Sequence, residues 1–350
     1  MFWTDSVEKR LYRAKLSDKN SIRSVVVEDD FKRTDDIAVD WVYNNVYWAS
    51  GARRTISVTN LEGDFIFDVV DDDLENPQSL AVHPKKGWMF WSDWGNISKI
   101  EKSGMDGSNR IVLVTDNVVW PTGITLDLVM ERIFWLDAKL HIIGSVGVDG
   151  SLPNIIRVSS SPLHHQFRLS VMEDSVFWSE SGPDTSSIYQ ADKADGTQVK
   201  LLTTAKLVRS TEISTQTRPK DLSIQHHQPM SVTAYHQLMQ PSSPNLCLAR
   251  PILCSHICVP APAPLTLPST LPTTCLCPRQ YSRLEDHSTC VFISTKSGDT
   301  ETRQADVKTV SKEVLKDTTV EETEGGNLTG LLIGFLVVLG VLISVVDFTY

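Results

Sequence analysis

Six cysteines are the residues of this chain whose type and spacing most directly predict chemistry. All of them fall in one short stretch, as Cys247, Cys254, Cys258, Cys275, Cys277 and Cys290. An even number of thiols this close together is typical of disulfide bonding in an oxidising compartment. A zinc site is the alternative, but the C-x3-C and C-x-C spacings differ from the usual C-x2-C pairs of such sites. We therefore expect a small extracellular disulfide module and no metal.

A glycosylation acceptor and an acidic surface are the next chemical features. Asn96-Ile97-Ser98 is an N-glycosylation acceptor in a predicted loop. The formal net charge of −10 argues against nucleic acid as a partner and favours basic partners. No nucleophile stands in a recognisable pattern with a base, so neither catalytic residues nor cofactors are predicted.

Five aromatic-tryptophan pairs predict the scaffold that must position these groups. Their tryptophans, at positions 3, 48, 91, 135 and 178, are 45, 43, 44 and 43 residues apart. A repeat of this length is typical of a β-propeller with four-stranded blades. The tryptophans are expected to fill the space between blades, and the acidic residues that follow them to bind backbone groups. These acidic residues are Asp5, Asp93 and Asp137.

The strand pattern gives the boundaries of the blades and an all-β fold. Short segments of alternating hydrophobicity are separated by Glu-Gly or Asp-Gly turns, which favour tight hairpins. Complete blades are predicted over 36–70, 77–115, 121–158 and 167–203, whereas residues 1–28 supply only three strands. A strand over 220–224 either completes a five-bladed ring or belongs to a propeller that lacks an upstream blade. We favour the second interpretation, because residues 1–5 also lack the charged and apolar regions of a signal peptide.

Two segments of different composition follow the cysteines. Residues 292–326 are rich in Ser, Thr and charge, which predicts a disordered stalk. Residues 328–346 carry no charge, and we predict a transmembrane helix over 327–346 with a short cytoplasmic end at 347–350. A glycolipid anchor is a poorer match. The predicted domains are thus a propeller at 1–240, a disulfide module at 241–291, the stalk and the helix.

Several motifs carry a family resemblance. They are Pro77-Gln78-Ser79-Leu80-Ala81-Val82, Phe90-Trp91-Ser92-Asp93-Trp94-Gly95, Trp120-Pro121-Thr122-Gly123-Ile124, Phe134-Trp135-Leu136-Asp137 and Cys254-Ser255-His256-Ile257-Cys258. Over about 1–291 the chain resembles the low-density lipoprotein receptor family, most closely its very-low-density lipoprotein, lipophorin and vitellogenin receptors. The cysteine region resembles that family's epidermal-growth-factor-like (EGF-like) module. This resemblance implies first–third, second–fourth and fifth–sixth cysteine pairing.

The resemblance also implies a function. In the family, a six-bladed Tyr-Trp-Thr-Asp propeller and the EGF-like region drive ligand release in acidic endosomes, by competing for cysteine-rich modules that bind the lipoprotein or vitellogenin-type ligand. This chain lacks those modules. His141 falls at the position of a pH-sensing histidine, whose side chain gains charge between pH 7 and 5. A second such histidine is replaced by Lys86, and His83 is its candidate substitute. Trp94 is a candidate for partner contact.

The expected protein is therefore a non-enzymatic, single-pass type I receptor fragment, with its propeller outside the cell or in the endosomal lumen. Two alternatives remain open. One is a truncated isoform or an incomplete gene model without independent activity, because one aromatic pair and the cytoplasmic Asn-Pro-x-Tyr signal are absent. The other is a propeller hydrolase with a central metal. Its ligands would come from equivalent points of several blades, which here are the mixed set Asp40, His83, Asp127 and Met172.

Overall fold

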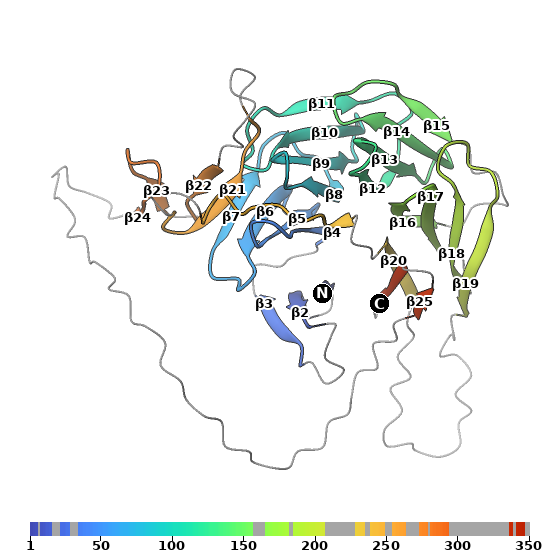
Figure 1. The fold of residues 1–350 in the computed structure, drawn as a ribbon, viewed down its shortest axis with the longest axis horizontal. Coiled ribbons are helices and arrows are strands. Elements are labelled where there is room, and N and C mark those ends of the chain that lie inside the picture. The colour runs from blue at the N-terminus through green and yellow to red at the C-terminus, as the bar shows by residue number, and fades with distance from the viewer. Residues whose placement is uncertain are drawn as a thin grey trace, which may run out of the picture.

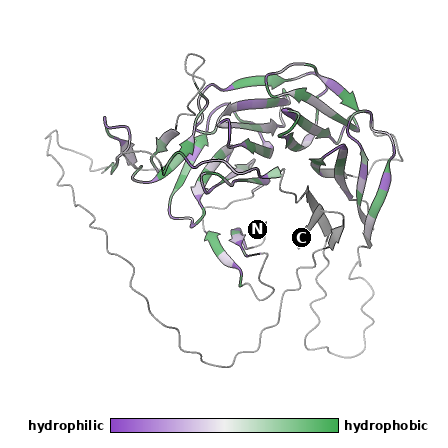
Figure 2. Cartoon of the chain, in the orientation of Figure 1, coloured by the Kyte–Doolittle hydropathy of each residue, from purple (hydrophilic) through white to green (hydrophobic). Residues whose placement is uncertain are grey.

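The computed structural model describes residues 1–5, 8–15, 22–28, 34–156, 165–181, 185–206, 228–234, 239–248, 254–263, 273–278, 281–293, 336–338 and 341–346. Five antiparallel sheets follow one another around an arc, as in a β-propeller (Figure 1). Each sheet runs in chain order, so every blade is built from successive hairpins. The prediction of an all-β propeller is confirmed. Hydrophobic and hydrophilic stretches alternate along the blades (Figure 2).

The first blade has three strands and the next two have four each. Blade 1 contains β1 (Phe2–Asp5), β2 (Arg10–Arg13) and β3 (Ser24–Val27). Blade 2 contains β4 (Asp36–Asp40), β5 (Asn45–Ser50), β6 (Thr55–Asn60) and β7 (Ile66–Val70). Blade 3 contains β8 (Pro77–His83), β9 (Trp88–Asp93), β10 (Lys99–Gly104) and β11 (Ile111–Val114).

The remaining two blades also have four strands. Blade 4 contains β12 (Pro121–Asp127), β13 (Arg132–Asp137), β14 (Ile142–Gly147) and β15 (Asn154–Ile156). Blade 5 contains β16 (His165–Met172), β17 (Ser175–Ser181), β18 (Thr185–Asp192) and β19 (Lys200–Lys206). These bounds match the blades predicted from the sequence. The strand predicted over 220–224 lies outside the described residues.

The tryptophans of the aromatic pairs fill the hydrophobic cores. Trp48, Trp91, Trp135 and Trp178 are each at most 2% exposed. Each lies on the second strand of its four-stranded blade, where its neighbours in the sheet and in the adjacent blade exclude water. Trp3 is only half-buried and stacks on Tyr12 at a ring-centroid distance of 5.6 Å. The structural role predicted for the pairs is thus confirmed for the four full blades.

The apolar C-terminal segment differs from its prediction. Two parts of the predicted transmembrane helix are strands, β25 (Leu336–Val338) and β26 (Val341–Val346). They pair with each other, and β26 also pairs with β20 (Gln228–Ala234). Among the residues that the structure describes, no helix is long and apolar enough to cross a membrane. A continuous run of apolar residues satisfies either a helix or a buried strand, so periodicity alone does not separate the two. The sheet lies between blade 5 and β1 (Figure 1).

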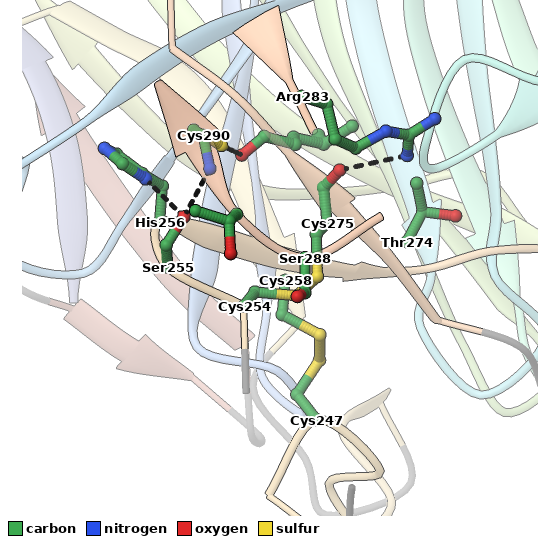
Figure 3. Close-up of a disulfide and its surroundings, with 12 residues drawn as sticks. Cys247, Cys254, Ser255, His256, Cys258, Thr274, Cys275, Arg283, Ser288 and Cys290 are labelled. Carbon is green, nitrogen blue, oxygen red and sulfur yellow. Dashed lines mark hydrogen bonds between the residues drawn. A yellow bond between two sulfur atoms is a disulfide. The ribbon is translucent and has the colours of Figure 1, made fainter. Parts of the chain in front are cut away.

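The disulfide-rich region follows the propeller. Its described strands are β21 (Ile257–Pro260), β22 (Thr273–Leu276), β23 (Tyr281–Arg283) and β24 (Cys290–Phe292), which form two short hairpins. Two of the bonds, Cys247–Cys258 and Cys254–Cys275, join residues labelled in Figure 3, and the third is Cys277–Cys290. This is the pairing that the module resemblance implies. Of the predicted stalk, only residues 292 and 293 are described.

Candidate functional site

The hairpin topology sorts the candidate residues onto two opposite faces of the propeller. In each full blade, the turn between the first and second strands lies at one end, and the loop between the second and third strands lies at the other. His83 ends β8 and so belongs to the first kind of turn, whereas Trp94 and His141 belong to loops of the second kind. The six-residue strand β9 separates these ends by about 17 Å. His83 and His141 therefore do not form one site.

Two aspartates organise the face that carries Trp94. The Asp93 carboxylate accepts hydrogen bonds from the backbone N–H groups of Glu75, at 3.1 Å, and Asn76, at 2.7 Å. Asp137 accepts through one oxygen from Val119 and Trp120 N–H groups, at 2.6 and 2.9 Å. Its other oxygen accepts from the N–H groups of residues 139 and 140. These acidic residues bind backbone groups, as predicted, and so fix the loops of this face.

The aromatic residues of this face form a partly exposed cluster. The Trp94 and Trp120 rings lie 5.7 Å apart between centroids, and Trp94 is 39% exposed. Lys139 Nζ lies 4.9 Å from the centroid of the Trp120 ring, which is within the range of a cation–π contact. We call Trp94, Trp120, Lys139 and His141 the Trp94 face. Exposed aromatic rings beside a cation are suited to contact with another protein.

His141 is held at the edge of this face by its loop. Its backbone N–H donates to Asp137 O at 2.9 Å, and its φ is +56°, in the left-handed region that histidine tolerates better than most residues. The side chain is half-buried, and within the described part of the chain its Nδ1 has no hydrogen-bond partner. The loop backbone, and not a side-chain hydrogen bond at Nδ1, therefore holds the imidazole in place.

His83 lies in a different environment on the opposite face. Its side chain is buried, and its Nε2 lies 3.4 Å from Glu131 Oε1 in the equivalent turn of blade 4. Lys86 Nζ donates to the other Glu131 oxygen at 2.8 Å. Desolvation by burial is the largest influence and lowers the pKa of His83, although the Glu131 carboxylate opposes it. His83 is therefore held in its neutral form more firmly than a solvated histidine.

The disulfide-rich region docks on the face that carries His83. Asn45 Nδ2 donates to Cys258 O at 3.0 Å, and Thr274 Oγ1 donates to Asp106 Oδ2 at 2.9 Å. Gly87, with φ +69°, lies so close to Ala261 that an added Cβ would be 2.6 Å from its carbonyl carbon. We call this the module face. The apolar part of the contact consists of Ile257, Val259 and Leu276 packed against Tyr47, Met89 and Met105, among others.

A histidine also links the parts of the disulfide-rich region to the propeller. The His256 ring lies 4.4 Å from the Phe65 ring of the propeller and 5.0 Å from the Tyr281 ring. Its Nδ1 lies 2.8 Å from Ser255 Oγ, which accepts a hydrogen bond from the Cys290 N–H at 2.9 Å (Figure 3). Desolvation lowers the pKa of His256. These contacts hold both hairpins against blade 2.

A cation occupies the centre of the ring. Arg168, on the first strand of blade 5, donates to Thr122 O at 2.9 Å and to Asp35 O, and its Nε lies 3.6 Å from Asp36 Oδ1. Asp36 in turn accepts from Ser79 Oγ at 2.6 Å. The first strands of four blades are thereby connected. Among the described residues, no three His, Cys, Asp or Glu side chains are grouped to hold a metal ion.

The two aspartates considered as ligands of a central metal instead bind backbone groups in the turns of their own blades. Asp40 accepts from the N–H groups of Val42 and Tyr43, at 3.2 and 3.0 Å. Asp127 accepts from Val129 and Met130 N–H groups and pairs with Lys193 Nζ at 2.7 Å. Each carboxylate thus closes the turn after the first strand of its blade, which accounts for its position in the repeat.

The structure places two of the predicted site residues on one face and adds site residues that the sequence did not indicate. It brings Trp94 and His141 onto one face, and it places His83 on the other. Sequence reasoning did not identify Trp120, Lys139 or Arg168 as site residues. Trp120 could have been found from its position just before the first strand of blade 4, whereas Arg168 has no sequence pattern that distinguishes it. Asn96 is exposed in the β9–β10 loop, two residues after Trp94.

Comparison with known proteins agrees with this architecture. The family model for the low-density lipoprotein receptor repeat class B matches residues 1–41 and 87–128. The vitellogenin receptor Yl of Drosophila melanogaster is 30% identical over 85% of this chain, although the chain spans only 13% of that receptor's length. The human low-density lipoprotein receptor-related protein 5-like protein is 30% identical over 51% of this chain and 69% of its own length.

A solved structure with a similar fold is a chain of the nidogen/laminin complex. It has 25% sequence identity and a TM-score of 0.51, over 58% of this chain and 74% of that one. The repeated aromatic pairs, the blades with their turn-capping aspartates and these sequence matches lead to one conclusion. The chain belongs to the low-density lipoprotein receptor family.

Proposed function

We propose that this chain is the propeller and EGF-like part of an endocytic receptor for a lipoprotein or yolk-protein ligand, and that it promotes ligand release in acidic endosomes. Ligand binding itself would belong to cysteine-rich modules that this chain does not contain. In this role the chain is not an enzyme: the Trp94 face is a contact surface, and Arg168 connects blade 5 to blades 2 and 4.

The observation that carries this proposal is the position of His141 on the same face of the propeller as Trp94, Trp120 and Lys139. At neutral pH this face presents aromatic rings with one cation, Lys139, above the Trp120 ring. Protonation of the imidazole at endosomal pH would add a second positive charge. A partner with carboxylates opposite this face would then bind more tightly, and in the family such a partner would be the ligand-binding modules of the same receptor.

His83 is the weaker of the two candidates for this role. It is buried on the module face, and the Glu131–Lys86 pair covers its accessible nitrogen. Its protonation would therefore act on the stability of the propeller instead of on a partner. Because the folded state depresses the pKa of His83, its neutral form contributes stability above pH 6.5, and this contribution declines as the pH falls below 6.5.

Binding at two pH values tests the proposal. The full chain would be immobilised, and recombinant cysteine-rich ligand-binding modules of a family member would be passed over it at pH 7.4 and 5.5. We expect tighter binding at pH 5.5 for the wild type and a reduced pH ratio for His141→Asn, because asparagine tolerates the same left-handed backbone. His83→Gln is the control on the opposite face. If both variants kept the wild-type ratio, the role of His141 would be wrong.

We propose further that residues 241–291 form an EGF-like module and that residues 327–346 cross the membrane as a single helix. The first proposal rests on the three disulfides and the two hairpins. The second rests on the uncharged stretch at 328–346, because in a bilayer a single segment satisfies its backbone groups only as a helix. On insertion, β25 and β26 would exchange their sheet hydrogen bonds for helical ones. Protease protection of residues 327–346 in membranes, with cleavage of the propeller from the lumenal side only, would support this topology. Release of the chain by alkaline carbonate would contradict it.

A further inference from the structure

The loop between β9 and β10 has a fixed conformation. Trp94 N–H donates to Asn76 O at 3.1 Å, and Asn96 N–H donates to Glu75 Oε2 at 2.8 Å. Ser98 Oγ donates to Val119 O at 2.8 Å, which connects the loop to the segment before Trp120. The loop is thus fastened at three points to the segments that precede the first strands of blades 3 and 4. The residues between these points hold defined positions on the Trp94 face.

Asn96 projects from this fixed loop beside an exposed aromatic ring. The residue is exposed, and its side-chain amide makes no hydrogen bond to any of the described residues. Trp94 precedes it by two positions and is 39% exposed, and Ile97 is 69% exposed. Asn96-Ile97-Ser98 is an N-glycosylation acceptor. An acceptor asparagine and a partly exposed tryptophan ring therefore lie on one short loop, and the Trp120 ring is tilted against the Trp94 ring.

We propose that an N-glycan on Asn96 packs its first N-acetylglucosamine against the Trp94 ring. The inference rests on the lumenal location in the proposed function. The sugar has an apolar C–H face and an acetamide methyl, which match the face of an indole ring better than water does. A two-residue spacing allows the sugar to fold back over the ring without moving the loop, because Glu75 and Val119 already hold its backbone.

The attachment is an ordinary amide glycosylation. Asn96 Nδ2 forms a bond to C1 of the first sugar of a lipid-pyrophosphate-linked oligosaccharide. The C1–O bond to the pyrophosphate breaks, the lipid pyrophosphate leaves with the bonding pair, and the amide nitrogen loses one proton. No oxidant or reductant is needed. Transfer precedes folding, so the later hydrogen bond from Ser98 Oγ to Val119 O does not prevent it.

The contact has a consequence for the Trp94 face. A sugar on Trp94 would cover the most exposed ring of the cluster and leave Lys139 and His141 accessible. The glycan would stabilise blade 3 and restrict which partners reach the tryptophans. The glycoform of Asn96 would then set how much of the Trp94 face is open.

The first test measures attachment. The full chain is expressed in eukaryotic cells behind a cleavable leader and purified from their membranes in detergent, and peptide mass spectrometry after enzymatic deglycosylation in heavy-oxygen water reports occupancy at Asn96. We expect the wild type to be glycosylated there and Asn96→Gln to lose that mass. An unmodified Asn96 in the purified chain would overturn the proposal. Because the leader imposes the lumenal compartment, this result does not depend on whether the chain acts as a receptor.

The second test measures the contact itself. The melting temperature is compared with and without the glycan, through Asn96→Gln, in wild-type and Trp94→Ala backgrounds. We expect the glycan to raise the melting temperature by about 2 °C in the wild type and to have no effect in the Trp94→Ala background. Equal shifts in the two backgrounds would refute the contact.

A matched acceptor separates this contact from a general effect of glycosylation. Asp195→Asn creates an acceptor with Gly196 and Thr197 at an exposed turn, where the residue two positions earlier is Lys193 instead of an aromatic residue. The asparagine oxygen can keep the hydrogen bond that Asp195 accepts from the Thr197 N–H at 2.8 Å. A glycan there is expected to leave the melting temperature unchanged. If Trp94→Ala does not fold, the chemical shift of the acetamide methyl proton replaces the comparison. We expect this signal to be shifted upfield in the wild type and not in Trp94→Leu, and an unshifted signal in the wild type would overturn the proposal.

Discussion

Asp40 is a buried carboxylate whose ionisation should oppose folding at neutral pH. It is 0% exposed and accepts hydrogen bonds from two backbone N–H groups and from Asn45 Nδ2, at 3.3 Å for the last. Desolvation by burial outweighs these hydrogen bonds and raises the pKa of Asp40 from 3.8 to about 6. Because the folded state holds this proton more tightly than the unfolded state, protonation stabilises the fold. Stability is lowest above about pH 6 and rises as the pH falls toward 3.8.

The size of the effect follows from the shift. A rise of about two pKa units corresponds to ~3 kcal/mol of penalty for the charged form, fully present at pH 7.5. About 2 kcal/mol of it should be removed by pH 4.5, where Asp40 is protonated in the folded state. Asp40→Asn removes the charge at every pH. It also places an amide N–H₂ opposite the donor group of Asn45, which we expect to cost about 1 kcal/mol.

Urea unfolding followed by tryptophan fluorescence measures the prediction. At pH 7.5, Asp40→Asn should be more stable than the wild type by about 2 kcal/mol, and this difference should fall by ~2 kcal/mol at pH 4.5. Asp127→Asn is the matched control in blade 4. It removes an ion pair to Lys193 and should destabilise the protein at both pH values. A difference between Asp40→Asn and the wild type that did not change with pH would show that Asp40 is already protonated or solvated.

Three further substitutions test the packing. Gly87→Ala should weaken docking of the disulfide-rich region by about 1–3 kcal/mol more than Gly150→Ala does. Both glycines have positive φ, but of the two only Gly87 faces a neighbouring backbone. Faster proteolysis of the disulfide-rich region alone would show the weakened docking. Trp135→Ala should lower the free energy of unfolding by about 3–5 kcal/mol, and Trp3→Ala by less, in the same urea assay. Arg168→Met should destabilise the ring by about 1–3 kcal/mol, because Asp36 loses its cation; an unchanged unfolding midpoint would contradict this.

The sequence predicted the blades well because they repeat. A buried tryptophan is needed at the same point on the second strand of every full blade, and blades 3 and 4 also have an aspartate at the end of that strand. The spacing of these residues therefore reports the fold directly. The cysteine pairing also followed from the resemblance to a known module.

Contacts between distant segments could not be predicted in this way. The hydrogen bond from Asn45 to Cys258 O and the contact of Arg168 with Asp35 join residues far apart in the chain, and a single sequence holds no record of such pairs. The apolar segment predicted as a helix gave strands in its described parts because uniform hydrophobicity has no period. His83 looked equivalent to His141 in chemistry, but hairpin topology placed it on the opposite face.

One measurement tests the central claim most directly: the affinity of the wild-type chain for cysteine-rich ligand-binding modules at pH 5.5 relative to pH 7.4. A charge-assisted contact from His141 should make binding about tenfold tighter at pH 5.5, and His141→Asn should abolish most of that ratio. Equal affinities at the two pH values, or a ratio that survives His141→Asn, would contradict the account.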